Sequence, residues 1–180
     1  MRIPEKIWQY VQNGTRLDRW LAAIMSNDLA LAVVYASPLE KHLIVPVRQL
    51  VYMAVPAGAH GRSQDVTDWE RIGGAFGYET NVLRRDVVEG LAYYDECGTR
   101  WTVTKEISGD PMSLVECSTD EGKNSVEWTV DQVIGKRRDG KPRNWLATYR
   151  EADYIGQYDT VVTQHFRFIG MEVPDAISQL

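Results

Sequence analysis

The spacing of apolar residues changes at Gly73-Gly74, and this change constrains the fold more than any other feature of the chain. Before the glycine pair, apolar residues recur every three or four positions, as along one face of a helix. From about Gly90 they tend to alternate with polar residues, and Trp, Tyr, Val and Thr accumulate, which is typical of strands. Glycine pairs commonly interrupt regular structure. We therefore predict two structural units, one helical and one β-rich, within 180 residues.

Residues 1–74 are predicted to form a small bundle of four or five short helices. Pro4 suits the first turn of a helix, and Asn13-Gly14 suits a helix end. A stripe with the spacing i, i+3, i+4, i+7 comprises Leu17, Trp20, Leu21 and Ile24. Because helices this short are marginal alone in water, their stability has to come from shared apolar packing.

The rest of the chain is predicted to be mainly antiparallel β structure. We interpret it as a connecting segment at 75–89, a β-rich unit at 90–170 and a tail at 171–180. Strands are predicted at 91–95, 100–107, 113–117, 125–130 and 160–168. Tight connections join the first four strands, which favours an antiparallel meander or a small open barrel. The predicted fold class is therefore α+β.

The charge of the chain is distributed unevenly. The net charge is −5. Residues 1–75 contain 8 Lys and Arg against 7 Asp and Glu, a balance of +1, whereas residues 76–180 contain 12 against 18, a balance of −6. An acidic half disfavours general binding to a phosphate backbone, which requires a basic surface. It permits binding to a basic partner.

The sequence carries no motif for a metal, a cofactor or nucleophilic catalysis. Cys97 and Cys117 are too few for a closed zinc site or a disulfide scaffold. The histidines, at positions 42, 60 and 165, lack a second ligand at helical or strand spacing. Neither a phosphate-binding loop nor a Gly-x-Ser-x-Gly motif is present. We expect no cofactor and no metal, and a protein that is not an enzyme.

The chain is expected to remain in a reducing cytoplasm. No apolar stretch approaches the roughly 20 residues of a membrane span. The first residues have charges and Pro4 but no continuous apolar core, so they do not resemble a signal peptide.

Aromatic side chains are the first class of candidate binding residues. The six Trp and nine Tyr exceed what a chain of this size needs, and such residues are enriched at interfaces. The candidate contacts for a protein partner are Tyr93, Tyr94, Trp145, Tyr149, Tyr154 and Tyr158. Asp and Glu residues are expected at the rim of this surface.

A dense basic segment is the second candidate. It comprises Lys136, Arg137, Arg138, Lys141 and Arg143. Trp145 follows it, so the segment could grip phosphates while the indole stacks on a base. The alternative is a solvated loop that neutralises nearby carboxylates, and the acidic surroundings favour this alternative.

The first 75 residues also resemble a known group of proteins. The matching segments include Ile3-Pro4-Glu5, Tyr10-Val11-Gln12-Asn13-Gly14, Trp20-Leu21-Ala22-Ala23, Asn27-Asp28-Leu29, Tyr52-Met53-Ala54-Val55-Pro56-Ala57-Gly58, Trp69 and Gly73-Gly74. These segments resemble small uncharacterised proteins of tailed phages and prophages. The chain departs from the pattern at His60, where Trp is expected. The resemblance implies a phage or prophage setting and no particular activity.

These observations favour an accessory protein that binds and blocks a host macromolecule. Such a protein, inside a bacterial host, would act by occluding the surface of a host protein or of a protein–nucleic acid complex, as an inhibitor of bacterial defence does. One alternative is a small nucleic-acid-binding protein that uses the basic segment 136–145. Further alternatives are a protein that sequesters a small ligand in a pocket between the units and a virion or assembly component. The oligomeric state stays open.

Overall fold

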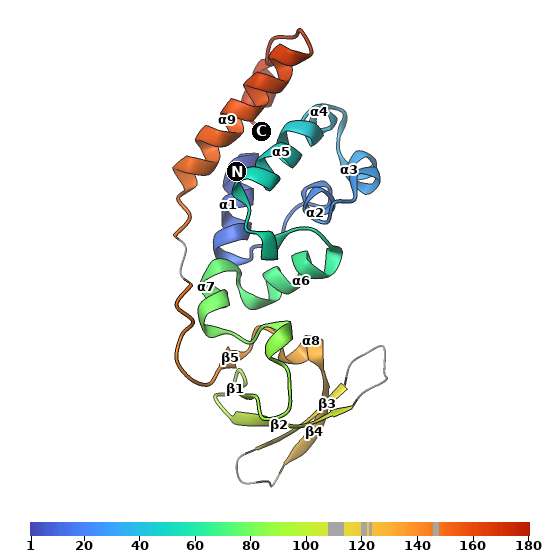
Figure 1. Cartoon of the computed structure of the whole chain (residues 1–180). Helices are drawn as coiled ribbons and strands as arrows, with labels where there is room; N and C mark the ends of the chain where they lie inside the picture. Colours follow the sequence, from blue (N-terminus) through green and yellow to red (C-terminus); the bar gives the residue numbers. More distant parts are fainter. Residues whose placement is uncertain (108–113, 120–121, 123, 146–147) are drawn as a thin grey trace. The chain divides into compact units, whose positions relative to one another are not determined.

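The computed structural model describes residues 1–107, 114–119, 122, 124–145 and 148–180. Within these residues the fold is α+β, as predicted, with helices and an open antiparallel sheet of five strands. The chain divides into two compact units (Figure 1). The helical unit comprises Met1–Glu70 with Ala147–Leu180, and the sheet unit comprises Arg71–Leu146. The division at Arg71 lies close to the predicted change at Gly73-Gly74.

The first part of the helical unit is helical, as predicted. Its helices are α1 (Ile3–Asn13), α2 (Arg19–Met25), α3 (Leu29–Tyr35), α4 (Pro38–Lys41), α5 (Ile44–Ala54), the 3-10 helix η1 (Ala57–Ala59) and α6 (Ser63–Ile72). Pro4 and Pro38 lie in first turns, where the missing N–H costs no hydrogen bond. Asp28 and Ser37 cap α3 and α4 by accepting backbone N–H donors. The local sequence therefore specifies where α1, α3 and α4 begin.

Residues 160–168 belong to a long helix, so the predicted last strand is wrong. Helix α9 spans Glu151–Phe168 and lies along α1 and α5 (Figure 1). Its buried side chains are Tyr154, Tyr158, Val161, Val162 and Phe166. They recur at the spacing of a helical stripe, and packing against α1 and α5 outweighs the strand preference of the β-branched residues. The predicted β-rich unit therefore does not extend to residue 170.

The predicted tail at 171–180 is also part of the helical unit. It contains the short helix α10 (Asp175–Ser178), and Ile177 is fully buried. The C=O of Leu180 accepts a hydrogen bond from the N–H of Ile3, the first residue of α1. The two ends of the described chain therefore meet in one unit.

The sheet unit begins with structure in the segment that we predicted to be a simple connection. Its elements are α7 (Gly74–Thr80), the 3-10 helix η2 (Arg84–Asp86), β1 (Ala92–Tyr94), β2 (Arg100–Ile107), β3 (Leu114–Thr119), β4 (Ser125–Thr129), α8 (Val130–Val133) and β5 (Arg137–Arg138). The connecting segment 75–89 thus contains most of α7 and all of η2. Gly73 and Gly74 have φ angles of +84° and +66°, which lets the chain turn between α6 and α7.

The strands follow the predicted antiparallel order. Their order in the sheet is β4-β3-β2-β1-β5, and every neighbouring pair is antiparallel. The predicted strands at 91–95, 100–107, 113–117 and 125–130 are confirmed as β1 to β4, except that residue 113 lies outside the described residues. β5 was not predicted. It adds to the free side of β1 and carries two residues of the basic segment.

One face of the sheet forms the core of this unit. Its buried side chains are Tyr93, Trp101, Val103, Val115 and Cys117. Trp101 and Val103 lie two residues apart on β2 and are both buried, as the period-two alternation of a strand requires for residues of one face.

Candidate functional site

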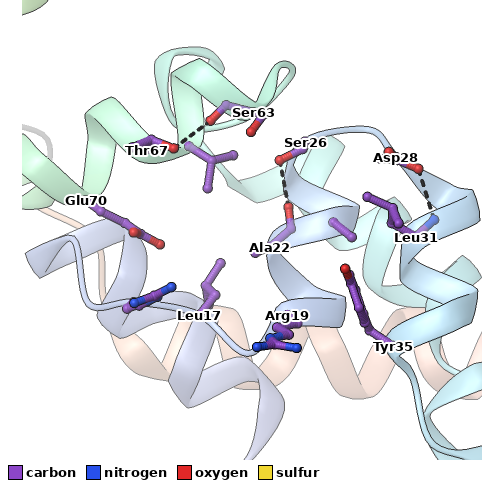
Figure 2. Close-up of a pocket in the computed structure, with 13 residues that line it drawn as sticks. Leu17, Arg19, Ala22, Ser26, Asp28, Leu31, Tyr35, Ser63, Thr67 and Glu70 are labelled. Atoms are coloured by element: carbon purple, nitrogen blue, oxygen red, sulfur yellow. Dashed lines mark hydrogen bonds between the residues drawn. The ribbon is translucent and has the colours of Figure 1, made fainter. Parts of the chain in front are cut away.

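A groove in the helical unit is the first candidate site. It has a volume of about 350 Å³ and lies among α2, α3 and α6 (Figure 2). Figure 2 shows α6 side chains such as Glu70 and Thr67 on one side, and α2 and α3 on the other. The lining residues are Arg16, Leu17, Arg19, Ala22, Ala23, Ser26, Asp28, Leu31, Tyr35, Ser63, Val66, Thr67 and Glu70. The apolar members form much of its wall.

Several polar groups of the groove are already engaged within their own helices. The hydroxyl of Ser26 donates to the C=O of Ala22 at 2.9 Å, and that of Thr67 donates to the C=O of Ser63 at 3.0 Å (Figure 2). The carboxylate of Asp28 accepts from the N–H of Leu31 at 3.0 Å (Figure 2). These three hydrogen bonds therefore hold the walls of the groove in place.

Two arginine side chains at the groove differ from these hydrogen-bonded polar groups, because no hydrogen bond within the described residues holds them. Arg16 and Arg19 are exposed, and within the described part of the chain neither side chain forms an ion pair or a hydrogen bond. The guanidinium carbon of Arg19 lies 5.8 Å from the centre of the Tyr35 ring, within the range of a cation–π contact. The groove thus offers two cationic donors beside an apolar wall. Such a site suits a carboxylate carried next to an apolar side chain.

Glu70 contributes negative charge at the α6 side of the groove. Burial is the main cause that raises the pKa of Tyr10, and the nearby carboxylates of Glu70 and Asp65 raise it further. The hydroxyl of Tyr10 therefore stays protonated, and it donates to the C=O of Ala59. Tyr10 is a structural residue behind the groove rather than a proton carrier in it.

Helix α3, which borders the groove, carries an exposed apolar surface. All seven residues of Leu29–Tyr35 are apolar or aromatic, yet only Ala32 is buried. The exposed fractions are 42% for Leu31, 46% for Val33, 71% for Val34 and 45% for Tyr35. Helices exposed on one side normally present a polar face to water. Large exposed apolar surfaces are found at protein or membrane contacts and at ligand grooves, so α3 is a candidate contact surface.

The six aromatic candidates are divided equally between the two units. Tyr93, Tyr94 and Trp145 lie in the sheet unit, whereas Tyr149, Tyr154 and Tyr158 lie in the helical unit. Tyr93, Tyr154 and Tyr158 are buried, so they belong to the core and not to an exposed interface. Burial raises the pKa of Tyr158 to about 12 and raises the pKa values of Tyr93 and Tyr154 above their ordinary value.

The other three aromatic candidates are half-buried and make local contacts. The ring of Trp145 lies 4.2 Å from that of Tyr78, between centroids. The C=O of Tyr149 accepts from the indole N–H of Trp8 at 2.9 Å, which ties this segment to α1. Tyr94 lies under the guanidinium of Arg137. Three of the six predicted interface residues are therefore core residues, and Tyr94, Trp145 and Tyr149 stay candidates for a contact.

Some residues of the basic segment form contacts within the protein, and the others line a cleft. Lys136 pairs with Glu96 at 2.6 Å. Arg143 pairs with Asp86 and also donates to the C=O groups of Tyr78 and Asn81 at 2.7 and 2.9 Å. Lys136 and Arg143 thus support the loop, as the alternative interpretation expected. The other three members, Arg137, Arg138 and Lys141, line a second cleft.

The two cysteines and Asp95 lie in surroundings that explain them structurally. Cys97 is exposed in a turn, and burial raises the pKa of the Cys117 thiol above its ordinary value. Asp95 accepts from the N–H groups of Cys97 and Thr99 and from the indole of Trp101, which orders the turn before β2. Among the described residues, no three His, Cys, Asp or Glu side chains are arranged to hold a metal ion.

Comparison of the chain with models of protein families, with curated proteins and with solved structures gave no match. No helix in the described part of the chain combines the length and the apolar character that a membrane crossing requires.

The sequence did contain a signal for the α3 surface. The run from Leu29 to Tyr35 lies between the capping residues Asp28 and Ser37 and contains no charged residue. A helix without a polar face is normally buried, so an exposed one stands out as a candidate contact surface. The groove itself had no such signal, because it depends on how α2, α3 and α6 pack.

Proposed function

We propose that this protein is an accessory protein of a phage or prophage that binds a host protein and occludes its working surface. The contact surface in this proposal is α3 with the adjoining groove, in place of the aromatic face expected from the sequence. The observation that carries the proposal is the exposure of Leu31, Val33, Val34 and Tyr35 on one short helix. Burying such side chains against a partner stabilises a complex by removing apolar area from water.

The groove supports the proposal because its charged side chains can fix the orientation of a bound partner. Apolar contact with α3 contributes affinity but does not fix how the partner is oriented. Arg16 and Arg19 favour a partner that places a carboxylate at the groove. We therefore expect the host protein to present an apolar contact with acidic residues at its rim. The resemblance of residues 1–75 to phage and prophage proteins supports the phage setting, and within that setting we propose a component of bacterial defence as the target class.

The experiment compares two exposed apolar positions. Val34 on α3 and Phe168 at the end of α9 are 71% and 89% exposed, so neither substitution should disturb the core. Wild type, Val34→Glu and Phe168→Glu are used to capture proteins from a host lysate, and the captured protein is then purified for affinity measurements. We expect Val34→Glu to weaken binding at least about tenfold. Phe168→Glu should bind as wild type does.

Two results would contradict the proposal. One is a lysate from which the wild-type protein recovers no specific partner. The other is a partner that binds Val34→Glu and wild type equally, because the contact would then lie elsewhere on the protein.

A further inference from the structure

A second cleft, in the sheet unit, collects the open part of the basic segment. It has a volume of about 320 Å³, and its lining includes Thr80 at the end of α7, Tyr94 of β1, and the chain from Arg137 to Pro142. The antiparallel register of β1 and β5 places Arg137 opposite Tyr94 and Arg138 opposite Tyr93. Sheet pairing thus places Arg137 on the same face as the Tyr94 ring, and Arg138, the next residue of the strand, also lines the opening.

Among the described residues, the cations at this cleft form no ion pair with the one carboxylate of the lining, Asp139. Asp139, the acid in the lining, pairs with Arg100 at 2.8 Å, and the hydrogen bond from Arg100 is the main cause that lowers the pKa of Asp139. In the described part of the chain, Arg137, Arg138 and Lys141 form no ion pair with a carboxylate. The positive charge of Arg137 also contributes to lowering the pKa of Asp139, but the two side chains are not in contact as an ion pair.

The two arginines are positioned before any ligand arrives. The guanidinium carbon of Arg137 lies 4.5 Å from the centre of the Tyr94 ring, which holds an exposed cation in place. Arg138 donates from Nη2 to the C=O of Lys141 at 2.6 Å. The Nε of Arg138 is buried and has no hydrogen-bond partner among the described residues. A buried donor without a partner is unfavourable, and an anionic oxygen would satisfy it.

This arrangement fits a phosphate group attached to a nucleoside. Guanidinium groups bind phosphate oxygens through paired donors, and Lys adds a point charge. Arginine planes and tyrosine rings are also surfaces on which unpaired bases stack. We propose that the cleft formed by Tyr94, Arg137, Arg138 and Lys141 binds a nucleotide phosphate, either of a free nucleotide or of single-stranded nucleic acid. This site is separate from the α3 surface and does not depend on the proposed function.

The test uses the full-length protein with three probes: inorganic phosphate, uridine monophosphate and a labelled oligonucleotide of about six uridines. Arg137→Gln and Lys141→Gln each remove one positive charge from the cleft. Lys105→Gln is the matched control, because Lys105 is exposed on β2 of the same unit and does not line the cleft. We expect each cleft variant to weaken binding at least about fivefold and the control to change it less than about twofold.

The probes distinguish the two sources of phosphate. Binding of the oligonucleotide but not of the monophosphate identifies single-stranded nucleic acid, and binding of the monophosphate or of phosphate alone identifies a small free ligand. A single-stranded ligand should also show a salt dependence of about 0.7 in log–log slope for each phosphate contacted. Either result supports the cleft only if Arg137→Gln and Lys141→Gln weaken binding and Lys105→Gln does not. Binding that both cleft variants leave unchanged overturns the proposal.

The proposal is overturned if none of the three probes binds at about 1 mM in low salt. It is also overturned if Lys105→Gln weakens binding as much as the cleft variants, since the effect would then be one of total charge. Arg137 stacks on Tyr94, so its variant is checked by circular dichroism. Lys141 is exposed, so its variant keeps the test decisive if Arg137→Gln disturbs the fold. Val34→Glu should retain phosphate binding, which separates this site from the protein contact.

Discussion

At the scale of single residues, Gly135 and Gly98 show how differently two glycines of similar backbone conformation constrain the sheet unit. Their φ angles are +86° and +81°. A Cβ added at Gly135 would lie 2.0 Å from the backbone oxygen of Arg71, whereas a Cβ added at Gly98 would meet nothing within 4 Å. The first glycine is therefore required by both conformation and space, and the second by conformation alone.

Gly135→Ala should consequently destabilise the protein much more than Gly98→Ala does. A left-handed conformation costs an L-residue about 1–2 kcal/mol, which is the whole cost expected for Gly98→Ala. Gly135→Ala adds a backbone clash, so its loss of unfolding free energy should exceed that of Gly98→Ala by at least about 2 kcal/mol. Urea unfolding followed by tryptophan fluorescence measures both. Equal losses would show that α6 and the chain at Gly135 do not approach so closely.

Asp131 gives the sheet unit a dependence on pH. Its carboxylate accepts from Arg84 and pairs with Arg71 at 3.0 Å. The hydrogen bond from Arg84 is the main cause that lowers its pKa in the folded state, and the charges of Arg71 and Arg84 add to the effect. Because the folded pKa lies below the unfolded value of about 3.9, the unfolded chain binds more protons in acid. The stabilisation is therefore present above about pH 4 and is lost as the pH falls through the folded pKa.

Asp131→Asn should reduce this acid sensitivity. The side chain is 45% exposed, so solvent screening limits its contribution to at most about 1 kcal/mol at neutral pH. The difference in melting temperature between wild type and Asp131→Asn should shrink as the pH falls from about 6 to about 3. Glu89→Gln, which changes an exposed acid of the same unit, is the control. A difference that stays constant with pH would mean that the ionic contacts do not stabilise the fold.

At the scale of secondary-structure elements, the caps of α3 and α4 allow binding to be separated from stability. Asp28 accepts from the N–H of Leu31 at 3.0 Å, and Ser37 accepts from the N–H of Glu40 at 3.3 Å. Removing either cap by substitution with Ala should cost about 1 kcal/mol of unfolding free energy. Only α3 carries the proposed contact surface, so Asp28→Ala should weaken partner binding and Ser37→Ala should not.

Affinity measurements on the two cap variants, with denaturant unfolding beside them, check this prediction. The matched loss of stability is the essential control, because general destabilisation would affect both variants in the same way. Equal affinities for Asp28→Ala and Ser37→Ala would argue against α3 as the contact helix.

How far the sequence predicts each element depends on whether the signal is local. Pro4, Asp28 and Pro38 mark helix starts through backbone chemistry, and each was found where the local pattern predicts it. The turn containing Gly98 is equally local. Helix α9 was mistaken for a strand because Thr160, Val161, Val162 and Thr163 favour strands, whereas its helical stripe becomes decisive only when α1 and α5 are beside it.

The candidate sites were less predictable than the elements. Counting aromatic residues did not reveal that Tyr93, Tyr154 and Tyr158 fill cores, because burial depends on tertiary packing. The basic segment was recognised in the sequence. Which of its cations are paired, however, depends on carboxylates far along the chain. Glu96 and Asp86 neutralise Lys136 and Arg143 and leave the neighbouring cations open.

At the scale of the whole molecule, the helical unit is assembled from two parts of the chain that the sheet unit separates. Its first part ends at Glu70, and α9 supplies buried side chains from beyond residue 150. The core of this unit is therefore complete only when the end of the chain has been made and has packed against α1 and α5. A substitution near the end of the sequence should thus affect a unit that begins at the first residue.

Phe166 and Phe168 test this assembly and the helical assignment together. Phe166 is 1% exposed and Phe168 is 89% exposed. In a strand these two residues would point to the same face, and truncating either would have a similar effect. In α9 they point in different directions, so Phe166→Ala should cost about 3–5 kcal/mol of unfolding free energy and Phe168→Ala less than about 0.5 kcal/mol.

Denaturant unfolding followed by the helical circular dichroism signal measures both variants. A large loss confined to Phe166→Ala would show that the end of the chain closes the core of the helical unit. Because α3 packs against helices of the same unit, that loss should be accompanied by weaker partner binding at temperatures where the unit begins to unfold. Similar small losses for both variants would instead mean that α9 contributes little to this core, and that the first 70 residues hold α3 in place without it.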